Sequence, residues 1–146
     1  MTRAIDARLH DAFGLYEVLV ATLDDGALTR RLGDLPSNEI GQQLWCVVGA
    51  RESYTRAIQR DGWAGFGCSL AAADTHDRNR VADALQASAA AASEALAGLQ
   101  ELSEVQERLA LTLLEHEAQH HGQLIRYLYG LRLPIPEAWK ERYSLA

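Results

Sequence analysis

Long apolar segments are missing from this chain. No run approaches the roughly eighteen apolar residues that a membrane-spanning helix needs, so the sequence predicts no membrane span. The opening residues, MTRAIDARLHDAF, contain no uninterrupted apolar stretch and do not indicate a secretory signal peptide. Cysteine is also rare, because Cys46 and Cys68 are too few for a disulfide framework. We therefore expect a cytoplasmic protein in a reducing compartment.

Basic residues are too few for a nucleic-acid-binding surface. The chain has 14 Lys and Arg against 20 Asp and Glu, a net charge of -6, whereas a phosphate backbone requires a concentrated basic face. Proline is scarce, and 48% of the residues are hydrophobic, which is typical of a folded domain rather than a disordered segment. A length of 146 residues suits one domain, residues 1–146, with a sizeable core.

Strand patterns are absent as well. No long alternation of β-branched and aromatic residues occurs, and no Asn-Gly or Asp-Gly pair separates two such runs. Helical spacing of apolar residues occurs four times instead, and the second of these rows includes Arg51. The four rows predict helices over roughly residues 3–23, 37–60, 75–99 and 103–131. The connections after the first two helices are long enough for crossovers, so we expect an all-α protein built as a four-helix bundle.

Capping residues indicate where these helices begin and end. The hydroxyl of Ser37 is expected to cap the second helix, and Thr75 is expected to cap the third. Ser103 and Gln106 have the spacing of a capping box at the start of the fourth. Two prolines stop that helix, and the remaining segment EAWKERYSLA is expected to form a short helix or a packed tail.

The fourth predicted helix carries His116 and His120 on its apolar row, with leucines before and after them. Residues four apart lie on one face of a helix, so both imidazoles can point at one metal ion. A buried imidazole without a partner costs about 1–3 kcal/mol. The pair therefore predicts either a metal site or hydrogen bonds to groups such as Gln42 or Gln123.

The string HEAQH also matches the zinc-protease pattern, in which the glutamate, here Glu117, is the general base. No glycine-spaced downstream histidine follows, and no sheet is expected that would bind a peptide substrate. We therefore expect Glu117 to be a surface carboxylate or a group that supports the metal ligands. His121 is rotated away by about 100° and is expected to be partly exposed. His10 and His76 stand alone and are expected to face solvent or to cap turns.

Two segments of the chain resemble the DinB-like (damage-inducible) superfamily of metal-binding four-helix bundles. They are SNEIGQQLWCVVGARESY in the second predicted helix and HEAQHHGQLIRYLYGLRLPIPEAW in the fourth. The later segment is the more distinctive, because it joins H-x-x-x-H-x-G-Q-L to a Gly-Leu-x-Leu-Pro turn. The resemblance spans nearly the whole chain. It implies an up-down-down-up bundle that is frequently a homodimer.

The resemblance also implies three histidines around a divalent ion, two of which match His116 and His120. Related sequences often carry the third histidine after a tryptophan of the second helix, where this chain has Cys46 after Trp45. A cysteine thiolate is a good zinc ligand and would complete a three-ligand site with an open position. Alternatively, Cys46 is a small packing residue on a face shared with Gly49, and the site has only two ligands. The expected ion is divalent, zinc or nickel.

Three further side chains are candidates to support the ligands or to contact substrate. Gln123 follows His120 by three residues, Glu117 lies between the two histidines, and Glu52 matches a supporting position of the family's second helix. Some members of the family use the metal to activate a low-molecular-weight thiol, so the resemblance implies a metal-dependent thiol S-transferase acting on a small electrophile. The alternative is a non-catalytic or degenerate bundle that binds a metal or small ligand in a stress response.

Overall fold

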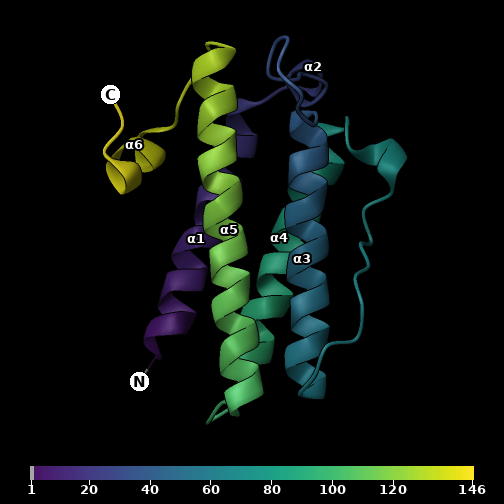
Figure 1. Ribbon diagram of the computed structural model, residues 1–146, viewed down its shortest axis with the longest axis vertical. Helices are drawn as coiled ribbons and strands as arrows, with labels where there is room; N and C mark the ends of the chain where they lie inside the picture. Colours follow the sequence, from purple (N-terminus) through teal and green to yellow (C-terminus); the bar gives the residue numbers. More distant parts are fainter. Residues whose placement is uncertain (1) are drawn as a thin grey trace.

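The computed structural model describes residues 2–146, and all regular secondary structure within them is helical (Figure 1). The long helices are α1 (Ala4–Thr22), α3 (Ile40–Arg60), α4 (Arg78–Ala97) and α5 (Glu104–Gly130). The short ones are α2 (Asp25–Leu28), the 3-10 helix η1 (Ala72–Asp74) and α6 (Glu137–Tyr143). The predicted all-α class is confirmed, and the four long helices lie where the four apolar rows predict them.

The long helices pack in a definite pattern of pairs. Helix α3 packs against both α4 and α5, and α1 packs against the same two helices. The apolar residues that they bury form two clusters. One contains Tyr16, Leu44 and Trp139, and the other contains Phe13 and Leu113. None of the helices in residues 2–146 combines the length and apolar composition that a membrane crossing requires.

The start of α3 differs from the prediction. The hydroxyl of Ser37 does not cap this helix, because it accepts a hydrogen bond from the amide of Leu32 in the preceding loop. Helix α3 begins at Ile40, and the side-chain oxygen of Gln42 accepts a hydrogen bond from the amide of Glu39 (3.0 Å). Ser37 therefore organises the loop that enters the helix.

The start of α4 also differs, whereas the start of α5 is as predicted. Thr75 follows the 3-10 helix η1, and the N-cap of α4 is Asp77, whose carboxylate accepts hydrogen bonds from two backbone amides of the first turn. A carboxylate caps a helix as well as a hydroxyl does and also favours the positive end of the helix dipole. At α5 the capping box of Ser103 and Gln106 is confirmed.

The C-terminal segment is both a short helix and a packed element. The side chain of Trp139 in α6 is fully buried, and its indole N–H donates to the carbonyl of Leu15 in α1 (2.7 Å). Burying an aromatic side chain of this size contributes a large hydrophobic term, and the hydrogen bond satisfies its polar atom. Helix α6 is thereby fixed against α1.

Candidate metal site

Three side chains that the sequence singles out converge between α3 and α5. Cys46 comes from α3, and His116 and His120 come from α5. One candidate ligand atom from each residue lies within 4.8 Å of the other two. The centroids of the two imidazole rings are 4.5 Å apart, as expected for residues one helical turn apart on the same face.

The spacing of these atoms fits a metal ion with nitrogen and sulfur ligands. The sulfur of Cys46 lies 3.7 Å from Nε2 of His116. Tetrahedral zinc with ordinary bond lengths would separate a sulfur and a nitrogen ligand by about 3.6 Å. The Cys46 sulfur therefore lies where it could bind the same ion as His116. The alternative packing role also has support, because Cys46 is only partly exposed.

A hydrogen bond orients His120 for ligation. Its Nδ1 lies 2.6 Å from the side-chain oxygen of Gln43 on α3. If the amide oxygen accepts the proton on Nδ1, then Nε2 carries the free lone pair that a metal requires. The sequence suggested the adjacent Gln42 or Gln123 as partners of the histidines, so Gln43 was missed. Its buried side chain is 7% exposed.

Burial shifts the pKa of each of the three candidate ligands toward its uncharged form. Burial raises the pKa of the Cys46 thiol. Burial lowers the pKa of His116, and the positive charge of Arg51 lowers it further. Burial and the neighbouring His116 lower the pKa of His120 to about 4. Neutral imidazoles are ready to bind a cation, whereas the thiol must lose its proton to become a strong ligand.

Two buried polar atoms close to this group have no hydrogen-bond partner among the described residues. They are Nδ1 of His116 and Oε1 of Gln123. Both belong to α5, and Gln123 lies one turn beyond His120. Unsatisfied buried polar atoms are costly, so they are informative where they occur beside a cluster of possible ligands. The two imidazoles, the thiol and these free atoms together fit a metal-binding site.

Glu117 is not a surface carboxylate, which was one of the two roles that we had expected for it. Its side chain is fully buried, and both carboxylate oxygens accept hydrogen bonds from Arg51, at 2.8 and 3.0 Å. Burial raises the pKa of Glu117, and the Arg51 guanidinium opposes that rise. Because Arg51 occupies both oxygens, Glu117 is not available as the general base of a metalloprotease.

The position of Arg51 in the sequence is a sign of its ion pair with Glu117, which we had not predicted. An arginine on the apolar row of α3 has to find a buried acid or remain uncompensated. The guanidinium also donates to the carbonyl of Leu85 (2.9 Å) and lies over the rings of Phe13 and Tyr16, at 4.5 and 5.0 Å from their centroids. It therefore joins all four long helices next to the candidate ligands.

Glu52 holds a loop. Its carboxylate accepts hydrogen bonds from the backbone amide (2.7 Å) and the hydroxyl of Ser69, in the connection between α3 and α4. Gly49 faces the same connection, since a side chain at this position would meet Phe66 and Cys68. The face of α3 that carries Gly49 therefore packs against this connection.

His121 is buried, which corrects the expectation of partial exposure. Its side chain is 1% exposed, and its ring nitrogens lie 2.6 Å from the hydroxyl of Tyr143 and 3.1 Å from the carbonyl of Ala12. Burial lowers its pKa to about 4. Helices α1 and α6 cover this side of α5, so His121 is a packed core histidine. His10 and His76 are exposed, as expected.

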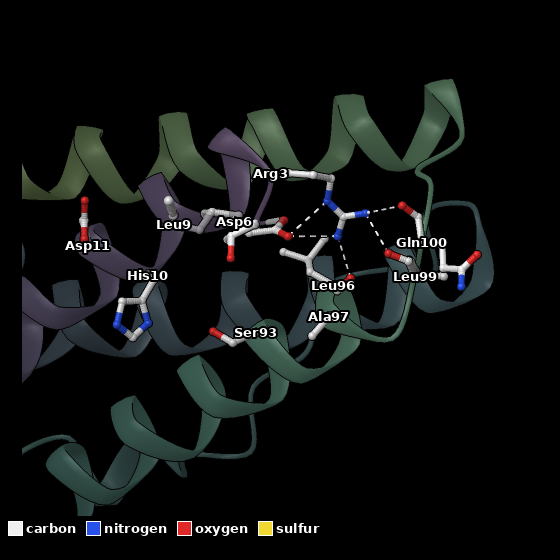
Figure 2. Close-up of a pocket in the computed structure, with 12 residues that line it drawn as sticks. Arg3, Asp6, Leu9, His10, Asp11, Ser93, Leu96, Ala97, Leu99 and Gln100 are labelled. Carbon is white, nitrogen blue, oxygen red and sulfur yellow. Dashed lines mark hydrogen bonds and ion pairs between the residues drawn. The ribbon is translucent and has the colours of Figure 1, made fainter.

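A cavity of about 850 Å³ lies away from this site, at the end of the molecule where α1 begins and α4 ends (Figure 2). Arg3 bridges the two helices there, donating to the carbonyls of Leu96 (2.6 Å) and Leu99 (2.7 Å) and to Asp6 (3.0 Å). None of the three candidate ligands lines this cavity. The hydrogen bonds of Arg3 satisfy carbonyls at the end of α4, which is a structural role.

Comparisons with protein-family models, with curated proteins and with solved structures found no significant match to this chain.

Proposed function

We propose that this protein binds a divalent metal ion, zinc or nickel, through Cys46, His116 and His120. The observation that carries the proposal is the convergence of three suitable ligand atoms from two helices within 4.8 Å. Three protein ligands leave an open coordination position, which is typical of catalytic rather than structural zinc sites. Cys46 and His116 are partly exposed whereas His120 is buried, so the open position faces the side that solvent reaches.

We infer that the scaffold is an up-down-down-up four-helix bundle of the DinB-like type. The contacts of α1 and α3 with both α4 and α5 support this arrangement. So does the course of the chain in Figure 1, which rises along α1 and α5 and descends along α3 and α4. The segment 61–77 supplies the long crossover that such an order requires, because α3 and α4 run in the same direction (Figure 1). From the same resemblance we propose a homodimer, and from the two free cysteines a cytoplasmic location.

The reaction that we propose is the transfer of a low-molecular-weight thiol to a small electrophile. The ion in this site would lower the pKa of a thiol that occupies the open position. The thiol gives up its proton to solvent, its sulfur forms a bond to an electrophilic carbon, and the leaving group departs with the electrons of the broken bond. Gln43 would keep His120 oriented throughout, because its hydrogen bond involves only Nδ1.

The alternative is a non-catalytic bundle that binds a metal or a small ligand without turnover, as part of a stress response. Burial raises the pKa of the Cys46 thiol and lowers the pKa of both imidazoles, which favours the small-ligand form of this alternative, because the uncharged groups are stable without an ion. The two functions share the same three residues. They differ in whether a substrate thiol occupies the fourth position.

Metal binding is tested first, on protein purified without an affinity tag. Elemental analysis and calorimetric titration with zinc are expected to give one ion per chain. His116→Ala is expected to weaken binding at least about 100-fold, whereas His10→Ala, which removes an exposed histidine elsewhere, leaves it unchanged. Cys46→Ala decides the third ligand. No zinc binding to the wild-type protein, or equal affinity of the His116→Ala variant, would contradict the proposal.

Turnover is tested next, with glutathione, bacillithiol and mycothiol as donors and a small activated halide as acceptor. We expect conjugation that is abolished by a chelator and restored by zinc or nickel. Metal binding without turnover on any of these thiols would favour the non-catalytic alternative. Casein degradation that a chelator abolishes would instead indicate a metalloprotease, which the ion pair of Glu117 with Arg51 argues against.

A further inference from the structure

A polar cavity lies next to the candidate ligands and shares a wall with them. It has a volume of about 560 Å³, within the range of small-molecule sites, and Gln43, Gln123 and Arg126 line it. Gln43 lines the cavity and also contacts the candidate ligand His120, because its side-chain oxygen lies 2.6 Å from Nδ1 of His120. A ligand in this cavity is thus separated from a metal ligand by one amide group.

The charge of this cavity contrasts with that of the whole chain. The protein has a net charge of -6, yet no aspartate or glutamate lines the cavity, and Arg126 is its single charged residue. Among residues 2–146, Arg126 forms no ion pair and no side-chain hydrogen bond. A guanidinium presents two parallel N–H groups that match a carboxylate. One free arginine favours a singly charged carboxylate over a doubly charged phosphate.

The two glutamines specify what else a ligand would carry. The oxygen of Gln43 faces His120, so its NH₂ group remains as a hydrogen-bond donor. The oxygen of Gln123 is buried without a partner and would accept an N–H or O–H of a ligand. Gln123 and Arg126 lie three residues apart on α5 and therefore share a face. The cavity offers a cation, a donor and an acceptor within reach of one another.

We propose that this cavity binds the carboxylate of the thiol substrate, with Arg126 pairing with the carboxylate and Gln123 accepting from an adjacent N–H or O–H group. The proposal rests on the proposed function, because it assigns the substrate class of the same site. None of Cys46, His116 and His120 lines the cavity, so a thiol whose carboxylate pairs with Arg126 would reach the histidines around the side chain of Gln43. Arg126 is here a specificity-determining residue.

The test compares 3-mercaptopropionate with 3-mercaptopropionamide, which has the same length and thiol without the charge. Dissociation constants are measured by ligand-observed NMR on the zinc-loaded protein. We expect the acid to bind about tenfold more tightly than the amide. Arg126→Gln is expected to remove this preference while affinity for the amide and zinc content stay unchanged. Arg108→Gln, an exposed arginine earlier on α5, is the matched control and retains the preference.

Four results would overturn the proposal that Arg126 binds the carboxylate. An acid-to-amide ratio of one, a ratio unchanged in Arg126→Gln, or an equal loss in Arg108→Gln overturns the proposal. So does inorganic phosphate that displaces the acid at lower concentration than acetate does. Repeating the titration after chelation separates this proposal from that of the metal site. If the protein binds no metal, affinity for both thiols is unaffected by the chelator but the ratio still depends on Arg126.

Discussion

The buried ion pair between Arg51 and Glu117 gives the sharpest quantitative prediction. Both side chains are fully buried, and two hydrogen bonds of 2.8 and 3.0 Å join them. Replacing Glu117 by Gln leaves the Arg51 charge in the core with a neutral partner. Removing one partner of a buried pair typically costs about 3–5 kcal/mol. That loss is a large share of the roughly 5–15 kcal/mol by which a domain is stable.

The double variant tests whether the loss comes from the unpaired charge. Arg51→Met and Glu117→Leu together remove both charges, so the pair of substitutions is expected to cost less than the sum of the single ones. The coupling between the two sites should be at least about 2 kcal/mol. Arg108 and Glu104 provide a matched control, because they also lie 2.9 Å apart but are largely exposed. Arg108→Gln is expected to cost no more than about 0.5 kcal/mol.

The assay is urea unfolding followed by far-UV circular dichroism, with the free energy of unfolding extrapolated to water for each variant. The helical content of each folded variant is checked before the comparison. A loss below about 1 kcal/mol for Glu117→Gln would refute the reasoning, because a buried unpaired guanidinium cannot be that inexpensive. Simple additivity of the two substitutions would equally show that the charges are not coupled.

Three further predictions concern other parts of the chain. Burial lowers the pKa of His121 to about 4, so the unfolded chain binds more protons between pH 6.5 and pH 4. The part of the unfolding free energy that comes from keeping His121 neutral is fully present above pH 6.5 and decreases as the pH falls toward 4. His121→Gln should therefore remove about 3 kcal/mol of pH dependence from the unfolding free energy, as measured by urea titrations. Zinc binding at pH 6.5 should release about one proton from wild type and none from Cys46→Ser. The number of protons is obtained by calorimetry in buffers of different ionisation enthalpy, and equal release from the two proteins would exclude a thiolate ligand. Gly41→Ala should cost about 1–3 kcal/mol because the new carbon would overlap the carbonyl oxygen of Thr75, whereas Gly49→Ala meets an exposed, movable ring and should cost less; similar melting temperatures for the two variants would contradict this.

Local sequence patterns predict much of the helical architecture, because a helix is specified by contacts within about four residues. The four apolar rows locate α1, α3, α4 and α5, and the capping box locates the start of α5. The pairing of His116 with His120 follows from the same local spacing. The chain therefore determines which residues share a helix and which of those share a face.

Local sequence patterns are less reliable for deciding which of two neighbouring residues on a helix faces the core. Gln43 supports His120, although the adjacent Gln42 had been suggested. His121 is buried, although its rotation from the apolar row predicted partial exposure. One residue corresponds to about 100° around a helix. Which of two neighbouring residues faces the core therefore depends on how the packed helices cover that face, and α6 covers His121.

The pairing of Arg51 with Glu117 was decided by the tertiary structure alone, whereas the family resemblance had already matched Cys46 to the two histidines. Arg51 and Glu117 are 66 positions apart, and Cys46 and His116 are 70 apart. No local pattern records such a separation, because the rotation and height of one helix relative to another depend on the packing of the whole core. The sequence by itself determined the helices and the two-histidine face on α5. The packing of α3 against α5 placed the Cys46 sulfur beside that face and joined Arg51 to Glu117 behind it.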